Sequence, residues 1–142
     1  HRFEVNKFLK EITRVLADKT DCLALSYTDK GDVFHAGHAN ILNNPEFYDI
    51  DVTREVLSMI DEYNKLSSLF THVTGDETIH LIIGDDFGND FFQSLGLVFT
   101  DFSAGDIKGS LGIIGPSRLN YPLIIPTIRY FGELVSEISK NW

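Results

Sequence analysis

Cysteine, basic charge and long apolar runs are all scarce in this chain. A single cysteine, Cys22, excludes an internal disulfide framework and fits a reducing compartment, so we expect a cytoplasmic protein. No apolar run approaches the roughly 20 residues needed to span a bilayer, so we expect no membrane association. Residues 1–5 do not resemble a signal peptide, and the missing initiator methionine suggests a fragment or a processed chain.

Basic side chains are outnumbered. Lysine and arginine number 12 against 21 aspartates and glutamates, which gives a formal net charge of −9. Proteins that bind DNA draw much of their affinity from neutralising phosphates. A chain this acidic, without a basic cluster, is a poor stand-alone nucleic-acid binder, and it would not favour anionic membranes.

The apolar residues, 43% of the chain, follow two periodicities that predict one domain, 1–142. Helical spacing predicts helices over 3–18 and 52–70, the second capped by Asp51, and a last helix that ends near Lys140. Its start lies between Tyr121 and Pro126. Apolar runs bounded by turn residues predict five strands: 23–27, 33–36, 79–83, 95–102 and 107–114.

The predicted order is helix, two strands, helix, three strands, helix. Short hairpin turns at 28–32 and 103–106 indicate an antiparallel sheet, and 37–49 is predicted as a loop. Helices layered on such a sheet give an α+β fold of the size of GAF and PAS domains. Pro122 and Pro126 are expected in or before the first turn of the last helix, where a missing N–H costs little.

Residues 112–121 are the most informative segment, because an apolar strand runs there into a sharp turn. Gly115 and Pro116 are expected to stop the strand, and a permanent cation and an aromatic ring follow. As a structural turn, the cation pairs with an acid or caps a carbonyl; as a recognition turn, it binds an anion or a partner. The structural interpretation is favoured for this candidate turn, which comprises Gly115, Pro116, Ser117, Arg118 and Tyr121.

Residues that suggest metal chemistry have simpler explanations. His35 and His38 form the nearest thing to a metal pair, but zinc needs three or four ligands and no cysteine pairs with them. Residues 85–90 are acidic, yet they lack the regular ligand alternation of a calcium loop, and a solvated turn is favoured. We therefore predict no metal and no cofactor.

Glycines recur every third residue at Gly109, Gly112 and Gly115. Two of them lie inside a predicted strand, so close approach of a neighbouring strand or helix explains them better than a phosphate cradle does. Cys22 sits beside apolar strand residues and is expected to be an inert, buried thiol. No local Ser–His–Asp or Cys–His arrangement is visible, and we predict that the chain is not an enzyme.

Three stretches together resemble a known family. Residues 112–121 closely resemble the G-V-I-G-P-T-R-M-x-Y run of the bacterial heat-inducible transcription repressor family HrcA. Residues 37–47 are similar to that family's G-x-x-N-L-L-x-x-P-E-F, and 82–86 lie where the family carries I-G-x-E. Residues 9–13 also resemble its early helix segment, L-x-x-L-T. The second stretch supplies the motif residues Asn40, Pro45, Glu46 and Phe47.

The resemblance implies a dimeric repressor of chaperone operons. Family members carry a winged-helix DNA-binding domain and a GAF-like domain with an inserted dimerising subdomain. They bind an inverted-repeat operator, and the GroEL chaperonin helps to keep them active. The chain departs from this pattern, since it contains no winged helix and leaves little room for the inserted subdomain.

We therefore expect the GAF-like regulatory and dimerisation domain of an HrcA-type repressor, which forms a homodimer. Operator DNA would be contacted only through a winged-helix domain outside this chain, and a GroEL-type chaperonin is a candidate partner. The alternative is a GAF-like small-molecule sensor, in which Arg118 and Tyr121 read an anionic or aromatic group.

Overall fold

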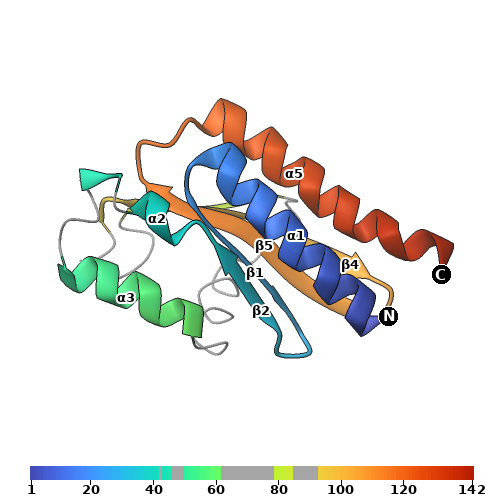
Figure 1. Cartoon of the computed structure of the whole chain (residues 1–142). Coiled ribbons are helices and arrows are strands. Elements are labelled where there is room, and N and C mark those ends of the chain that lie inside the picture. The colour runs from blue at the N-terminus through green and yellow to red at the C-terminus, as the bar shows by residue number, and fades with distance from the viewer. Residues whose placement is uncertain (42, 46–49, 62–78, 85–92) are drawn as a thin grey trace.

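A computed structural model describes residues 1–41, 43–45, 50–61, 79–84 and 93–142. The helices and strands follow the predicted order, with one short additional helix and a closing 3-10 turn (Figure 1). In chain order they are α1 (Arg2–Thr20), β1 (Leu23–Thr28), β2 (Val33–Ala36), α2 (His38–Ile41), α3 (Ile50–Asp61), β3 (Ile79–Ile83), β4 (Leu95–Ala104), β5 (Ile107–Pro116), α5 (Tyr121–Glu137) and η4 (Ile138–Asn141).

The five strands form one antiparallel sheet in the order β2-β1-β5-β4-β3. Its centre is the hairpin of β4 and β5, two ten-residue strands paired from Leu95 opposite Pro116 to Ala104 opposite Ile107. Gly105 closes this hairpin at a φ of 65°, in the left-handed region that favours glycine. The sheet places the N-terminal hairpin beside the C-terminal strand, with β1 paired to β5.

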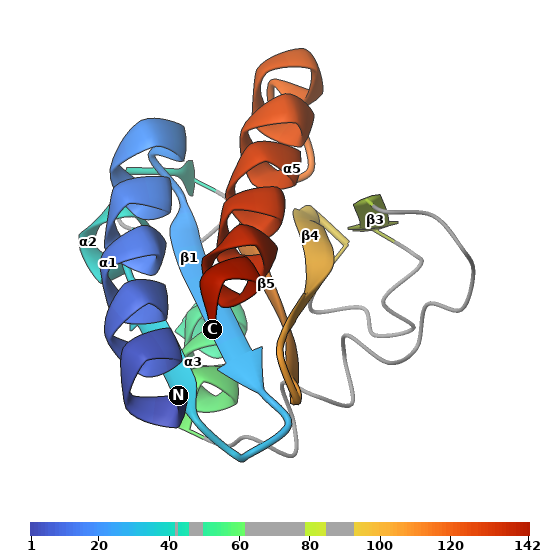
Figure 2. The same cartoon turned by 90° about the vertical axis from the view of Figure 1, so that its right-hand side faces the viewer.

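Helices α1 and α5 lie side by side on one face of the sheet (Figure 2). In each helix, apolar residues at helical spacing form one face, and this face packs against the strands. Thr13 adds polar contacts to this layer: its hydroxyl donates to the Leu9 carbonyl at 2.6 Å and lies 2.8 Å from the Ser26 hydroxyl. The buried helix residues include Val5, Leu9, Ile12 and Leu16 of α1 and Ile124, Ile128, Phe131 and Val135 of α5.

The opposite face of the sheet carries a second apolar cluster. Val52 and Val56 of α3 pack there with alternate residues of the strands, so the sheet lies between helical layers. This is the predicted α+β, GAF-like architecture. The strand residues of this cluster are Leu23, Leu25, Tyr27, Ile82, Leu95, Leu97, Phe99 and Ile114.

Four local predictions need correction. The strand predicted over 107–114 ends two residues later, at Pro116: Gly115 and Pro116 are both paired with β4, and Pro116 is tolerated because it is the last residue of β5. Asp51 does not cap α3, because the helix already begins at Ile50. Its carboxylate lies in the first turn, where it interacts favourably with the positive end of the helix dipole. Pro126 lies inside α5, beyond the first turn, at an exposed position where water can hydrate the carbonyl that loses its partner.

The fourth correction concerns the predicted loop 37–49, which contains the short helix α2. Helix α3 is described as far as Asp61, and the remainder of the predicted helix, 62–70, lies outside the described residues. None of the helices in the described ranges is long and apolar enough to cross a membrane.

Candidate functional site

The two segments with the strongest motif pattern, 37–47 and 112–121, meet at Cys22. Helix α1 ends just before this residue, where Asp21 adopts a left-handed conformation with φ 54° and donates its backbone N–H to the Ala17 carbonyl. The chain then turns into β1. This corner joins the first helix to the sheet, and Gly37, Asn40 and Gly115 of the two segments pack on it.

Segment 37–47 contacts the corner through its backbone and one amide. The Asn40 side chain donates a 2.9 Å hydrogen bond to the Cys22 carbonyl, with a longer one of 3.5 Å to Ala17. Gly37 has a φ of 89°, and a Cβ there would lie 2.5 Å from the Cys22 carbonyl oxygen. A glycine is needed here for both conformation and space. Pro45 is exposed, and Glu46 and Phe47 lie outside the described residues.

Segment 112–121 contacts the same corner from the sheet. A Cβ at Gly115 would lie 2.9 Å from the Cys22 sulfur and 2.8 Å from Leu119 Cδ2. The prediction of close approach is confirmed at the other two glycines, because a Cβ would overlap the carbonyl of Tyr27 at Gly109 and that of Val98 at Gly112. The glycine spacing is therefore a packing requirement of the strands.

Hydrogen bonds fix the turn between β5 and α5. The Ser117 N–H donates to the Ser94 carbonyl at 2.7 Å, and the Tyr121 hydroxyl donates to the Ser117 carbonyl at 2.6 Å. Burial raises the pKa of Tyr121 above its usual value, which keeps the hydroxyl protonated as a donor. Tyr121 thus stabilises the junction, while Arg118 is exposed.

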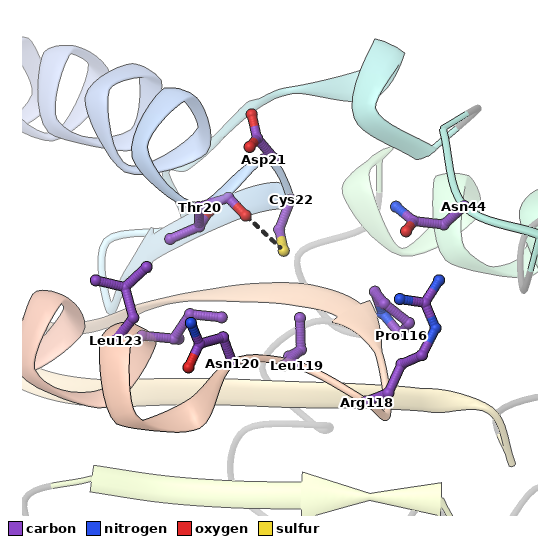
Figure 3. Close-up of a pocket in the computed structure, with 10 residues that line it drawn as sticks. Thr20, Asp21, Cys22, Asn44, Pro116, Arg118, Leu119, Asn120 and Leu123 are labelled. Atoms are coloured by element: carbon purple, nitrogen blue, oxygen red, sulfur yellow. Dashed lines mark hydrogen bonds between the residues drawn. The ribbon is translucent and has the colours of Figure 1, made fainter.

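An open cleft of about 290 Å³ lies between the corner and the turn (Figure 3). Arg118 and Asn44 lie at one end of it and Leu123 at the other, with Cys22 between them. Both polar and apolar residues line the cleft: Thr20, Asp21, Cys22, Asn44, Pro116, Arg118, Leu119, Asn120, Leu123 and Ile124.

Cys22 does not supply a nucleophile to this cleft. The residue is 4% exposed, its sulfur donates to the Thr20 carbonyl at 3.3 Å, and burial raises the pKa of the thiol to about 11. A thiolate is the reactive form, so the raised pKa disfavours reaction of this thiol at neutral pH. The predicted burial of the thiol is confirmed.

The predicted histidine pair is close in space, with the rings of His35 and His38 meeting edge to face at 4.5 Å. Within the described ranges, no group of three or more His, Cys, Asp or Glu side chains is placed to hold a metal ion. The acidic segment 85–90 lies outside those ranges.

A polar cluster that the sequence did not reveal lies on β3, β4 and β5. His80, 4% exposed, places Nε2 at 3.1 Å from one oxygen of Asp101, and Ser110 donates to the other oxygen at 2.6 Å. A hydrolytic triad needs the imidazole between hydroxyl and carboxylate. Here the carboxylate lies between the imidazole and the hydroxyl, so this arrangement cannot activate the serine. The cluster could have been predicted only from the strand register, which pairs Asp101 with Ser110.

Comparison with known proteins identifies the family. The model of the HrcA protein C-terminal domain matches residues 2–125, which is most of the chain. The chain belongs to the HrcA family. The heat-inducible transcription repressor HrcA of Syntrophobacter fumaroxidans is 30% identical over 138 residues, covering 90% of this chain and 40% of that protein. The repressor of the same name from Desulforudis audaxviator is 34% identical over 111 residues, covering 77% of this chain and 32% of that protein.

This HrcA-family chain therefore spans 40% or less of the length of those two relatives. Two solved structures share its fold. A protein described as hypothetical, solved at 2.2 Å resolution, superposes with a TM-score of 0.77 over 96% of this chain and 70% of that one. Myxococcus xanthus MglB superposes with a TM-score of 0.56 over 96% and 90%. Both are 13% identical to this chain, so the likeness concerns the fold alone.

Proposed function

We propose that this HrcA-family chain is the regulatory and dimerisation domain of a cytoplasmic, non-enzymatic negative regulator of heat-shock (chaperone) genes. The observation that carries the proposal is the family match over residues 2–125, together with relatives named heat-inducible transcription repressors. The role within the longer protein is to hold two DNA-binding domains at the half-site spacing of a palindromic operator.

The motif residues support a mechanical role. Asn40, Gly115 and Tyr121 are engaged in fixing the corner after α1 and the turn before α5. These residues set how the first and last helices lie on the sheet. A domain that precedes α1 in a longer protein would take its orientation from this helix, so the motif would transmit the state of the fold to the DNA-binding domain. Glu46 and Phe47 complete the motif in the proposal.

Operator DNA is contacted, in this proposal, through a winged-helix domain outside residues 1–142. The net charge of −9 supports this assignment, because an excess of acidic side chains disfavours binding to DNA phosphates. A GroEL-type chaperonin is the proposed partner that keeps the repressor folded and active. Heat would divert the chaperonin to unfolded proteins, and repression would lapse.

Sedimentation and DNA binding test the proposal together. We expect residues 1–142 to sediment as a dimer at micromolar concentration and to leave inverted-repeat operator DNA unshifted. A longer protein with a winged helix before α1 should shift that DNA, and a chaperonin should raise the active fraction after mild heating. A strict monomer at high concentration would contradict the dimerisation role. Operator binding by residues 1–142 alone would contradict the assignment of DNA binding to a separate winged-helix domain.

A small-molecule sensor is the second candidate, favoured by the open cleft of about 290 Å³ with Arg118 at one end. Because the Tyr121 hydroxyl is engaged by Ser117, Arg118 alone of the two predicted residues would contact an anionic ligand. A thermal-shift screen with nucleotides and organic acids tests this. An anion that stabilises the chain but not its Arg118→Ala variant would support the sensor, and no stabilisation by any compound would reject it.

A further inference from the structure

The start of helix α1 is bound to the turn between β1 and β2. Arg2 donates to both oxygens of the Asp32 carboxylate, from Nε at 2.9 Å and from Nη2 at 3.0 Å, and the Asn6 amide donates to the same carboxylate at 2.8 Å. A bidentate pair of arginine and carboxylate fixes direction as well as distance. The first turn of α1 therefore has a defined orientation on the first hairpin.

The C-terminal residue holds α1 from another side. The ring of Trp142 stacks on the ring of His1, with centroids 4.0 Å apart and planes inclined by 12°. The turn between β4 and β5 lies against the same indole, because a Cβ at Gly105 would lie 3.1 Å from Trp142 Cζ3. Figures 1 and 2 both show the two termini side by side at this end of the molecule. Residue 1 is thus a fixed point on the fold.

Phe3 is exposed directly beside this fixed point. Its exposed fraction of 79% is the largest among the large apolar side chains in the described part of the chain. Helical spacing places Phe3 in line with the exposed residues Lys7, Lys10 and Arg14, on the side of α1 that faces away from the sheet. The fold therefore does not need an aromatic ring at this position, which indicates a contact with something outside residues 1–142.

The length of the relatives supplies the occupant. The family model that matches residues 2–125 describes a C-terminal domain, and this chain covers 40% and 32% of the two relatives named above. In such a longer protein, the preceding chain enters at residue 1, because α1 begins at Arg2. A domain tethered there stays close to Phe3, at an effective concentration on the order of millimolar for a short linker. A contact too weak to form between separate molecules is then occupied.

We propose that Phe3 is the docking point of the domain that precedes α1 in the longer protein. This inference rests on the proposed function and deepens it, because it names where the DNA-binding domain contacts this one. Since Asp32 and Trp142 hold the start of α1, a domain seated on Phe3 takes its orientation from both hairpins of the sheet.

Thiol labelling at position 7 tests the docking directly, because Lys7 lies one helical turn beyond Phe3 on the same exposed face. In the longer protein, Lys7→Cys should react with a maleimide at least about fivefold more slowly than the same variant of residues 1–142. Mass spectrometry identifies the labelled peptide. Adding Phe3→Ser to the longer Lys7→Cys protein should restore the faster rate, and circular dichroism should show an unchanged fold.

Leu123→Cys is the matched control. Leu123 is 57% exposed and lies at the end of α5 farthest from the C-terminus, so it should react equally fast in the longer protein and in residues 1–142. The buried Cys22 is present in every variant and gives the same background.

Two results would overturn the docking at Phe3: equal labelling at position 7 in the two proteins, or slow labelling that persists after Phe3→Ser. Operator binding tests the proposed function separately. A longer protein that shifts operator DNA while position 7 stays reactive would keep the proposed function and reject the docking. A longer protein that protects position 7 through Phe3 but leaves operator DNA unshifted would keep the docking and reject the DNA-binding role.

Discussion

The side-chain amide of Asn40 donates a 2.9 Å hydrogen bond to the backbone carbonyl of Cys22, 18 residues earlier in the chain. This bond joins the segment after the first hairpin to the corner where α1 passes into β1. The carbonyl lies just outside the ladder of β1, so a side chain has to satisfy it. The family motif therefore begins with a structural contact.

Replacing Asn40 by alanine should destabilise the fold. Loss of the donor leaves the Cys22 carbonyl without its partner, which costs about 1–2 kcal/mol. Urea unfolding followed by circular dichroism measures the change. Asn43→Ala is the control, because Asn43 is exposed and donates to the Asn40 carbonyl with its backbone N–H, which the substitution keeps. Equal stability of the two variants would contradict the structural role of Asn40.

Replacing Tyr121 by phenylalanine isolates the hydroxyl that closes the turn before α5. The ring still packs, but the 2.6 Å bond to the Ser117 carbonyl is lost, so we expect about 0.5–1.5 kcal/mol of destabilisation. Tyr130→Phe removes an exposed hydroxyl from the same helix and should leave stability unchanged. If ligand binding rather than stability changed in Tyr121→Phe, the assignment of this hydroxyl to the turn would be wrong.

Alkylation should detect the state of Cys22. With a pKa of about 11, only about one thiol in a thousand is ionised at pH 8, against roughly a quarter for an ordinary thiol of pKa near 8.5. Iodoacetamide at pH 8 should label the native protein at least about 100-fold more slowly than the urea-unfolded protein. Similar rates in the two states would show that the corner opens readily.

The pH dependence of stability should report on Asp32. Arg2 and Asn6 donate to its carboxylate at 2.9 and 2.8 Å, and the hydrogen bond from Arg2 is the largest cause that holds the pKa of Asp32 below its usual value. A lowered folded-state pKa means that the carboxylate stabilises the fold above the unfolded-state pKa of about 3.9. This contribution is lost as the pH falls through the folded-state value.

The Asp32→Asn variant should therefore be less stable than the wild type at pH 7 and should approach it in acid. Urea titrations at pH 7, 5 and 3 measure the difference. Asp106→Asn, in the exposed β4–β5 turn, is the matched control and should show no such convergence. A difference for Asp32→Asn that persists unchanged at pH 3 would mean that packing, rather than charge, carries the effect.

Most helices and strands could be predicted, because local periodicity decides them. Val5, Leu9, Ile12 and Leu16 recur at helical spacing, and the same residues are buried on α1. The predictions failed where local signals compete with packing. The strand predicted over 107–114 runs two residues further, because pairing with Leu95 includes Pro116 as its last residue.

Only part of the candidate site could be predicted from the sequence. Residues 37–47 and 112–121 were recognisable as motifs, but their common contact with Cys22 depends on how two distant segments fold onto α1. The cluster of His80, Asp101 and Ser110 depends on strand register across three strands. No local pattern encodes which residues face one another across a sheet.

The sequence by itself determined the element order, the family and the need for glycine at close approaches, because these follow from neighbouring residues and their steric demands. The tertiary structure alone decided that Asn40 and Gly115 meet at one corner, that Tyr121 is engaged by its own turn, and that α5 leaves Leu123 and Tyr130 exposed. Those outcomes arise from long-range packing, in which each side chain finds its partner only after the sheet has brought distant segments together.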